Sequence, residues 1–569
     1  MKNIAKLVAV LLCICMLFTS CIPAGQSVDS SENTVNSQKV ENLEKLCKVW
    51  GYTKYNHPAF LFGEKDWDEE LLNLIPVVSE AKENEVNDIL HEWFVSLGEI
   101  DYGTSRPGSK PIENEAVVQA DTNWILDEAY LGEALSADMQ KMGPVPKIDR
   151  SKAPVKFSTG QSVPNFKMEN TDAGCSYQTE EERLLGLFRV WNAIEYYFPY
   201  LDIMDESWHD LLNEFIPKIL EASDVQSFEL TICEMTAHLH DVHVRFIKSQ
   251  PLKAVVGKYL APVNMLRTEE GQWVVSDLFW DCPLQVGDVI LKLDGTDIKE
   301  VEENRKKYVS VPNDEKLNNP LGVYLLRSKD EEMEITVLRD GKEETYSVKG
   351  TTEYTRMARK REKSHEILDG NIGLINPDSL STGDTGTVVR QVMEDLQDTD
   401  GLIIDLRQYP SDTNMHIFLS MYLQKVGTVY NIMTVPSQSV PGTFIKQEMV
   451  SMGVTPASFY YEKPVVVLMD ELSISNTEFS IMDLRTGDNV VVLGNNSLGT
   501  DGDITELSLP NGNLLWFTSC GIYTPEMGQT QRIGLSPDIE VYPTVEGIKE
   551  GRDELKEAAV AYIQEQNAK

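Results

Sequence analysis

Residues 464–485 read PVVVLMDELSISNTEFSIMDLR, and this stretch decides the fold because it joins a buried strand to a helix. Residues 464–470 are a short apolar run with three successive valines, typical of a buried strand in an α/β sheet. Ser, Asn and Thr side chains at 473–477 can cap a helix, and apolar residues recur at helical spacing over 479–484. Ser475 is therefore expected at a strand-to-helix corner, where backbone N–H groups and the positive helix end can hold an oxyanion. A serine that only caps the helix is the plainer alternative.

Apolar runs alternate with helical patterns from about residue 370 onward. The expected order is a strand at 371–376, a helix across 385–397, a strand at 402–407, a helix across 413–424, and the strand and helix of 464–485. Such alternation requires a parallel or mixed sheet with helices packed on it. Ligands bind such sheets at the carboxyl ends of the strands, where Ser475 and Ser411 are both expected.

Three further motifs stand in a specific order along the chain. LHDVHV lies at 239–244, VGDVILKLDG at 286–295 and LIIDLR at 402–407, and Glu478 follows Ser475 by three positions. This order resembles the S41 family of serine peptidases, which includes the C-terminal processing peptidases and the tricorn core protease. The resemblance covers roughly residues 180–550.

The resemblance implies a core of the ClpP/crotonase type with Ser475 as the nucleophile. Processing peptidases of the family carry a lysine base 25 residues after the serine, but this position is Thr500 here, so the Ser-Lys dyad is absent. Tricorn-like members take their base from a histidine, and His243 matches its position. A neutral imidazole suits a general base because its ordinary pKa, about 6.5, lies near neutral pH.

The resemblance also assigns the groups around the nucleophile. The backbone N–H of Asn476, with one from the loop near Ser411, is expected to bind the oxyanion. Gln531 stands where tricorn-like sites carry the acidic residue that orients the histidine. The group that fixes the imidazole tautomer is therefore left open, with Glu478 and Asp501 as candidates.

Two other functions stay open at this point. A catalytically silent S41 relative could bind peptides as a scaffold of the cell envelope, since the lysine is missing and Val242 replaces the helper serine of tricorn-like sites. A metal-dependent hydrolase is the second alternative, because His238, His240 and His243 form an H-x-H-x-x-H pattern that could ligate zinc. No second His or Cys group with metal spacing accompanies it, so neither a metal nor a cofactor is predicted.

The N-terminal segment predicts the compartment. A basic start and an apolar run at 7–18 precede FTSC at 18–21, which resembles a bacterial lipobox. We expect residues 1–21 to be a lipoprotein signal peptide, cleaved before an acylated Cys21, and 22–40 to be a tether. The protein is thus predicted to be anchored by lipid at the bacterial cell envelope, outside the cytoplasm.

The charge of the chain limits its binding partners, and its cysteine content limits its disulfides. The net charge of −39 argues against nucleic acid and against electrostatic adhesion to anionic lipid, so the acylated cysteine must provide the membrane attachment. The cysteines after residue 21 are odd in number and scattered, so no disulfide framework is implied. Peptides or unfolded proteins are the expected substrates, and the sequence fixes no oligomeric state.

The rest of the chain is predicted as a series of domains. Segments 43–76 and 184–217 look like one helical element written twice, because two tryptophans are 17 residues apart in each. The predicted divisions are helical repeat copy 1 at 41–105, a linker at 106–175, helical repeat copy 2 at 176–250, a PDZ-like domain at 251–350, and the S41 peptidase core with a C-terminal helix at 351–569. The expected fold class is therefore multidomain α/β, with a duplicated helical N-terminal region, a PDZ-like β domain and a ClpP/crotonase-like α/β core.

Overall fold

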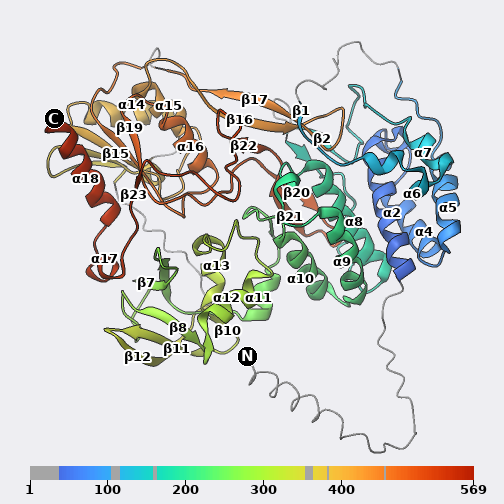
Figure 1. Cartoon of the computed structure of the whole chain (residues 1–569), viewed down its shortest axis with the longest axis horizontal. Coiled ribbons are helices and arrows are strands. Elements are labelled where there is room, and N and C mark those ends of the chain that lie inside the picture. The colour runs from blue at the N-terminus through green and yellow to red at the C-terminus, as the bar shows by residue number, and fades with distance from the viewer. Residues whose placement is uncertain (1–36, 104–115, 158–162, 353–362, 381–382, 454–456) are drawn as a thin grey trace, which may run out of the picture. The chain divides into compact units, whose positions relative to one another are not determined.

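The computed structural model describes residues 37–103, 116–157, 163–352, 363–380, 383–453 and 457–569 (Figure 1). The predicted signal peptide, Cys21 and most of the predicted tether lie outside these residues. Residues 37–40, predicted as the end of the tether, instead begin helix α2 (Ser37–Asn56), because Val40 packs on the helical core. Within the part of the chain that is described, no helix combines the length and the apolarity needed to cross a membrane.

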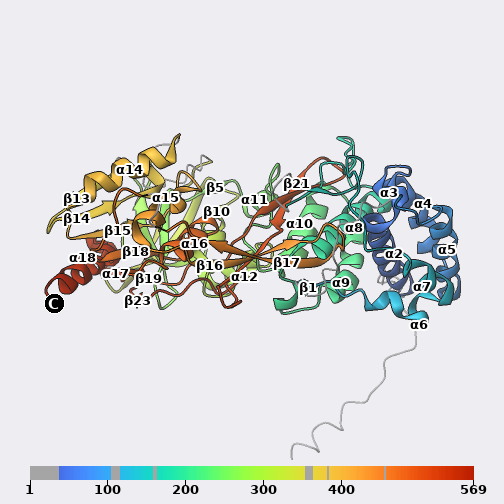
Figure 2. The same ribbon diagram turned by 90° about the horizontal axis from the view of Figure 1, so that it is seen from above.

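Two sets of helices form the N-terminal region and lie side by side in both views (Figures 1 and 2). The first set is α2, α3 (Pro58–Leu61), α4 (Trp67–Ser79) and α5 (Glu83–Ser96), and the second is α8 (Glu180–Tyr197), α9 (Trp208–Glu221) and α10 (Val225–Ala237). The Trp50 indole donates to Trp67 O at 2.8 Å, and the Trp191 indole donates to Trp208 O at 3.0 Å. Each of these bonds joins residues that are 17 positions apart, and one hydrophobic core spans both sets.

The predicted linker adds short elements and one buried carboxylate. Its elements are β1 (Ala116–Gln119), a 3-10 turn η2 (Asn123–Leu126), α6 (Glu128–Leu131), α7 (Glu133–Met139), β2 (Lys156–Phe157) and β3 (Pro164–Asn165). Glu169 accepts hydrogen bonds from the Lys54 ammonium at 2.5 Å and the Trp67 indole at 3.0 Å, and it lies 3.4 Å from the Arg189 guanidinium. Arg189 also pairs with Asp68 at 2.5 Å. This buried cluster of four charges ties the linker to both helical sets.

An antiparallel sheet with its own core follows the second set. Its strands are β6 (Val263–Arg267), β7 (Trp273–Leu278), β8 (Val289–Leu293), β9 (Thr296–Asp297), β11 (Glu332–Arg339) and β12 (Lys342–Lys349). The strand order is β12-β11-β8-β7-β6, with β9 against β8, so β6 lies at an edge. Helices and short strands around it are α11 (Pro251–Val256), β5 (Tyr259–Leu260), α12 (Ile298–Lys306), α13 (Asn318–Leu325) and β10 (Arg327–Ser328). Residues of β6, β7, β8, β11, α12 and α13 share this core.

The predicted α/β core is confirmed as a mostly parallel sheet. Its strands are β13 (His365–Leu368), β14 (Ile372–Ile375), β15 (Gly401–Asp405), β18 (Val465–Met469), β19 (Val490–Gly494) and β23 (Ile539–Glu540), in the order β13-β14-β15-β18-β19-β23, and only β13 is antiparallel. Alternate residues of β18 pack on opposite sides of the sheet. One side carries α14 (Thr385–Leu396), α15 (Met415–Leu423) and α16 (Asn476–Leu484), and the other carries α18 (Glu554–Asn567). Burial on both faces explains the continuous valine run.

Two smaller sheets connect this core to the helical region. One has the order β1-β17-β16-β22, with strands β16 (Val429–Pro436), β17 (Thr443–Val450) and β22 (Gly521–Tyr523). The other has the order β20-β21-β4, with strands β4 (Arg245–Phe246), β20 (Ile504–Ser508) and β21 (Leu514–Thr518). Helix α17 (Val545–Glu550) lies outside these sheets, near the C-terminus. Because β4 begins two residues after His243, this pairing brings the second helical set to the α/β core.

Candidate active site

Ser475 lies at the corner between β18 and α16, as the sequence predicts. Its backbone has φ 57° and ψ −126°, an unusual conformation for a residue with a side chain, and its N–H donates to Thr500 O at 2.8 Å. Such a conformation costs about 1–3 kcal/mol, persists only where the surroundings enforce it, and clusters at functional sites. A serine on a strained turn between strand and helix is also the arrangement of many hydrolase nucleophiles.

The neighbouring Ser473 has a different environment. Ser473 is buried, and its hydroxyl donates to Leu406 O at 2.8 Å and accepts from Asp470 N at 3.2 Å. Ser475 is instead partly exposed. Of these two serines, Ser473 therefore supports the loop and Ser475 faces the accessible side.

Glu478 holds the loop that flanks the serine. Its carboxylate accepts hydrogen bonds from Gly499 N at 2.8 Å, Thr500 N at 3.0 Å and Ser475 N at 3.3 Å, and from the Ser497 hydroxyl. Burial raises the pKa of Glu478, while the hydrogen bond from Ser497 and the charge of Lys316 oppose that rise. This predicted candidate for orienting the histidine thus fixes loop 497–500 against Ser475.

His243 is buried, and the β4–β21 pairing determines its surroundings. The antiparallel register pairs Phe246 with Leu515 and Arg245 with Trp516, so two residues further along Thr518 lies opposite His243. The Nδ1 atom of His243 is 2.8 Å from Thr518 Oγ1. Sheet pairing therefore supplies the partner of this imidazole nitrogen.

Asp241 supports the same imidazole. Its Oδ1 lies 3.7 Å from His243 Nδ1 and accepts from His243 N at 3.1 Å, and its Oδ2 accepts from Thr518 N at 3.1 Å. Burial lowers the pKa of His243, the charge of Asp241 opposes that effect, and the lowering prevails. A carboxylate and a hydroxyl oxygen at Nδ1 favour a proton there, which leaves the lone pair on Nε2.

Thr500 connects the serine and histidine segments. Its carbonyl oxygen accepts from Ser475 N at 2.8 Å, and its hydroxyl accepts from Val242 N at 3.4 Å. The residue that replaces the lysine of processing peptidases thus contacts the backbone of both segments. Ser475 and Val242, the residue before His243, therefore both bond to Thr500, the first through its carbonyl oxygen and the second through its hydroxyl.

The other two predicted orienting residues lie beside this loop. Asp501 Oδ1 accepts from Gly502 N at 2.7 Å, and burial raises the pKa of Asp501 well above its usual range. Gln531 Nε2 donates to His240 O at 3.5 Å. Among the described residues, Asp501 Oδ2 and Gln531 Oε1 have no hydrogen-bond partner. The groups that contact the His243 ring are instead Thr518 and Asp241, which the sequence prediction missed.

The three histidines of the H-x-H-x-x-H pattern have separate partners. His238 Nδ1 lies 3.2 Å from Glu206 Oε2, and His240 Nε2 lies 3.1 Å from Asp205 Oδ2. His243 faces Thr518 and Asp241, as described above. Across the described ranges, no three His, Cys, Asp or Glu side chains gather as metal ligands would.

The predicted oxyanion donors differ in availability. Ser411 N donates to Pro377 O at 3.1 Å, and its hydroxyl donates to Leu380 O at 2.6 Å, so this residue is committed to the loop that it anchors. Asn476 is the first residue of helix α16, so its N–H is one of the N-terminal donors of that helix. Ser411 N–H is thus bonded within its own part of the core, whereas Asn476 N–H lies at the start of α16 beside Ser475.

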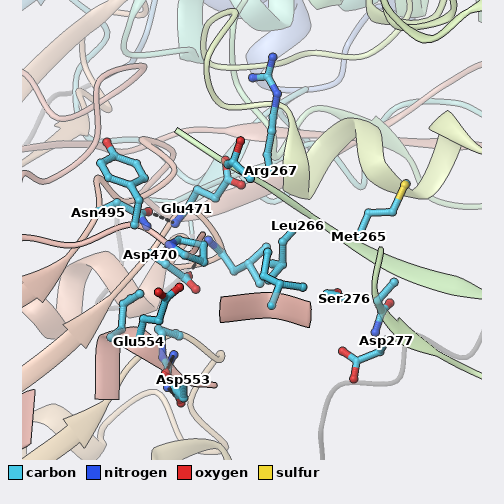
Figure 3. Close-up of a pocket in the computed structure, with 18 of the residues that line it drawn as sticks. Met265, Leu266, Arg267, Ser276, Asp277, Asp470, Glu471, Asn495, Asp553 and Glu554 are labelled. Atoms are coloured by element: carbon cyan, nitrogen blue, oxygen red, sulfur yellow. Dashed lines mark hydrogen bonds and ion pairs between the residues drawn. The ribbon is translucent and has the colours of Figure 1, made fainter. Parts of the chain in front are cut away.

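A cavity of about 1130 Å³ lies at the carboxyl ends of β15, β18 and β19 (Figure 3). Its walls include Asp470, Glu471 and Asn495 on one side and Met265 and Leu266 of edge strand β6 on the other. Burial raises the pKa of Asp470 to about 6, and the nearby Arg407 guanidinium opposes that rise. Ser475 does not line this cavity; it stands three residues after Leu472, the last residue of this loop that does.

Comparisons with known proteins agree with this architecture. Residues 371–541 match the model of a family described as peptidase family S41. No curated protein matches the chain in sequence. Mature CPAF complexed with lactacystin is 12% identical, with a TM-score of 0.52 over 68% of this chain and 99% of that chain. The photosystem II D1 C-terminal processing protease is 18% identical, with a TM-score of 0.39 over 65% of this chain and 98% of that chain. The likeness to CPAF shows a shared fold.

Proposed function

This chain is a serine peptidase of family S41, and from that premise we propose that it hydrolyses peptide bonds by a Ser-His mechanism. Ser475 is the nucleophile and His243 is the general base. The observation that carries this assignment is the shared attachment at Thr500, which holds the strained Ser475 backbone and the segment of His243 together. Asp241 and Thr518 orient the imidazole.

The chemistry follows from these positions. Ser475 Oγ attacks the scissile carbonyl carbon while His243 Nε2 takes the hydroxyl proton, and the carbonyl π electrons move to the oxygen. Asn476 N–H stabilises that oxyanion. The imidazolium then returns its proton to the leaving amine, which gives an acyl-enzyme, and a water activated by His243 hydrolyses the ester. The lowered pKa of His243 keeps the imidazole neutral at pH 7, as a base requires.

Substrates are peptides or unfolded proteins. Edge strand β6 can take an extended chain as an added strand, in the manner of a PDZ groove, and the cavity beside it has room for side chains. Folded proteins do not offer such a free extended segment. The structural role of this sheet is therefore substrate capture next to the catalytic serine.

Ser475→Ala is the direct test of the mechanism. Loss of the nucleophile should lower turnover of casein on the order of 10⁴-fold or more and abolish labelling by a fluorophosphonate probe. Ser473→Ala is the matched control: it leaves Leu406 O unpaired, so it should lower the free energy of unfolding by about 1–3 kcal/mol while the folded fraction still labels. Folded wild-type protein that neither cleaves nor labels would refute the assignment and favour a silent scaffold.

The membrane attachment forms a separate part of the proposal. Acylation of Cys21 anchors the peptidase at the bacterial cell envelope, outside the cytoplasm, since FTSC follows the apolar run. Metabolic labelling with a fatty acid should mark the wild type and leave Cys21→Ser unlabelled. Equal label on both proteins would contradict the anchor.

A further inference from the structure

Lys316 belongs to the segment between α12 and α13, beside the antiparallel sheet, and its ammonium reaches two loops of the α/β core. The residue is only 5% exposed. Its Nζ donates to Ile533 O at 2.7 Å and to Ser497 O. A Cβ on Gly534 would lie 2.5 Å from this Nζ, so glycine at 534 leaves the room that the ammonium needs. Lys316 therefore joins two loops that are far apart in the sequence.

These two loops support the catalytic serine. Ser497 N donates to Leu535 O at 3.1 Å, and Leu535 N donates to Ser497 Oγ at 2.7 Å, so the loops are also bonded to each other. The Ser497 hydroxyl donates to Glu478, whose carboxylate accepts from Ser475 N at 3.3 Å. Ser497 thus contacts the Lys316 ammonium through its carbonyl oxygen and the Glu478 carboxylate through its hydroxyl.

We propose that Lys316 is a positioning residue for the catalytic serine, which fixes loop 497–500 through Ser497 O and provides the cation that faces buried Glu478. This inference rests on the proposed role of Ser475 as the nucleophile. Lys316 acts through Ser497 and Glu478 rather than on the substrate, so it affects the rate of the chemical step more than the binding of a peptide.

The charges of Lys316 and Glu478 stabilise each other. Burial raises the pKa of Glu478, and the hydrogen bond from Ser497 and the charge of Lys316 oppose that rise. Burial lowers the pKa of Lys316 to about 8, and the charges of Glu478, Glu471 and Glu315 oppose that fall, so the ammonium prevails at pH 7. Above pH 8 a neutral amine still has two N–H donors for the two carbonyl oxygens, so the hydrogen bonds to both loops can persist.

Removal of the cation weakens the hold of Glu478 on the serine. The pKa of Glu478 then rises, and Asp501 faces the same carboxylate, so any charge on Asp501 acts in the same direction. A protonated carboxyl accepts fewer hydrogen bonds than a carboxylate, so it holds Ser475 N and the N–H groups of loop 499–500 less firmly. A misplacement of about 1 Å at a reacting group can cost about 10²-fold in rate.

Lys316→Met tests the proposal because it keeps the apolar stem and removes the charge and both donors. At pH 7 we expect kcat per folded protein to fall by about 10- to 100-fold, with KM changed by less than about twofold, and fluorophosphonate labelling to slow by a similar factor. The acid limb of kcat should move to higher pH than in the wild type, because ionisation of Glu478 then limits the rate. Casein cleavage between pH 5 and 9 measures both effects.

Arg305→Met is the matched control, since it also removes a buried cation that is bonded to backbone carbonyl oxygens. Arg305 donates to Leu325 O at 2.5 Å and to Arg327 O at 2.9 Å, both outside the catalytic loops. This variant should lower the free energy of unfolding but keep the kcat and the acid limb of the wild type. If Lys316→Met does not fold, Lys316→Gln replaces it: this variant keeps an amide donor without the charge, so its acid limb should move in the same direction with a smaller loss of kcat.

A double-mutant cycle with Glu478→Gln shows whether Lys316 acts through Glu478. Glutamine at 478 cannot ionise, so the acid limb of the double variant should return to that of the wild type. The loss of kcat in the double variant should also be smaller than the product of the two single losses. Two losses that multiply would show that Lys316 acts independently of Glu478.

The outcomes separate this inference from the mechanism on which it rests. A Lys316→Met variant with the kcat and acid limb of the wild type, or with losses that multiply with those of Glu478→Gln, overturns the positioning role. A change in KM alone would make Lys316 a substrate contact and overturn it as well. In each case the assignment of Ser475 stands if the wild type cleaves and labels and Ser475→Ala does not. If the wild type does neither, both proposals fall together.

Discussion

The two helical sets share an internal bond, but only the second leads into the candidate site. Trp50 and Trp191 donate to equivalent carbonyl oxygens, and both sets contribute to one core. After α5 the chain continues as LGEID at 97–101, whereas after α10 it continues into LHDVHV at 239–244. Similar packing is thus followed by two different continuations of the chain, and only the second leads into the candidate site.

One buried histidine, His57, lies within the first set, and another, His243, lies just after the last helix of the second set; the two differ in their partners. His57 caps helix α3 by accepting from Ala59 N at 3.2 Å, and burial lowers its pKa to about 4. His243 has the carboxylate of Asp241 and the hydroxyl of Thr518 at its ring. Burial alone therefore produces a neutral imidazole, but only an oriented imidazole beside a nucleophile can act as a base.

The largest expected effect comes from replacing each of these histidines by alanine in a separate variant. His243→Ala should lower kcat for peptide cleavage on the order of 10⁴-fold, because the serine loses its base. His57→Ala should lower the thermal midpoint while kcat per folded protein stays within about twofold. Steady-state cleavage of casein, corrected for the folded fraction by circular dichroism, measures both. Equal losses of kcat would show that the two sets do not differ in this way.

A smaller effect is expected in the pH profile. His243 must be neutral to accept a proton, and its pKa is lowered by burial, so kcat/KM should rise with pH, reach half its maximum below pH 6.5 and then stay flat. Asp241→Asn removes the charge that raises this pKa, so the acid limb should move to lower pH. The plateau should also fall by about 10²-fold or more, because the carboxylate no longer favours the proton on Nδ1.

The control for the pH profile is Asp138→Asn in helix α7, which removes a carboxylate 2.8 Å from His91 of the first set, far along the chain from the site. Its profile should match the wild type. An acid limb for Asp241→Asn that stays in place or moves upward would show that Asp241 does not act on the base.

The smallest effect tests the likeness of the two sets. Trp50→Phe and Trp191→Phe each remove one indole donor from a buried carbonyl oxygen. Each substitution should lower the free energy of unfolding by about 1–3 kcal/mol. Because the bonds are equivalent, the two costs should agree within about 1 kcal/mol in urea unfolding. A larger difference would mean that the shared spacing does not reflect shared packing.

The local patterns of the sequence predicted the corner at Ser475 well. A valine run followed by capping residues and helical periodicity specifies a strand, a turn and a helix from short-range preferences alone, and β18 and α16 follow it closely. Helix α2 begins at Ser37, so residues 37–40 of the predicted tether are helical, because Val40 packs on the helical core. Helix ends depend on such contacts, which no local pattern contains.

The partners of the catalytic candidates were harder to predict. Ser411 was expected to turn an N–H toward the site, but that N–H bonds to Pro377 O, in a separate segment of the core. Asp241 was within the quoted LHDVHV motif, two residues before His243, and its carboxylate was the signal available. Thr518 carried no such signal, because a threonine in a strand is an ordinary residue there.

The sequence by itself determined the α/β core, the serine at its strand-to-helix corner and the match of residues 371–541 to peptidase family S41, since each is written in contiguous residues. Only the tertiary structure decided what surrounds these residues. Thr518 reaches His243 across 275 positions because β4 and β21 pair in one register, and Thr500 joins the serine to the histidine segment across 258 positions. Hydrogen-bond partners at such separations follow from the pairing of strands and the packing of cores, which depend on the whole chain rather than on any single stretch.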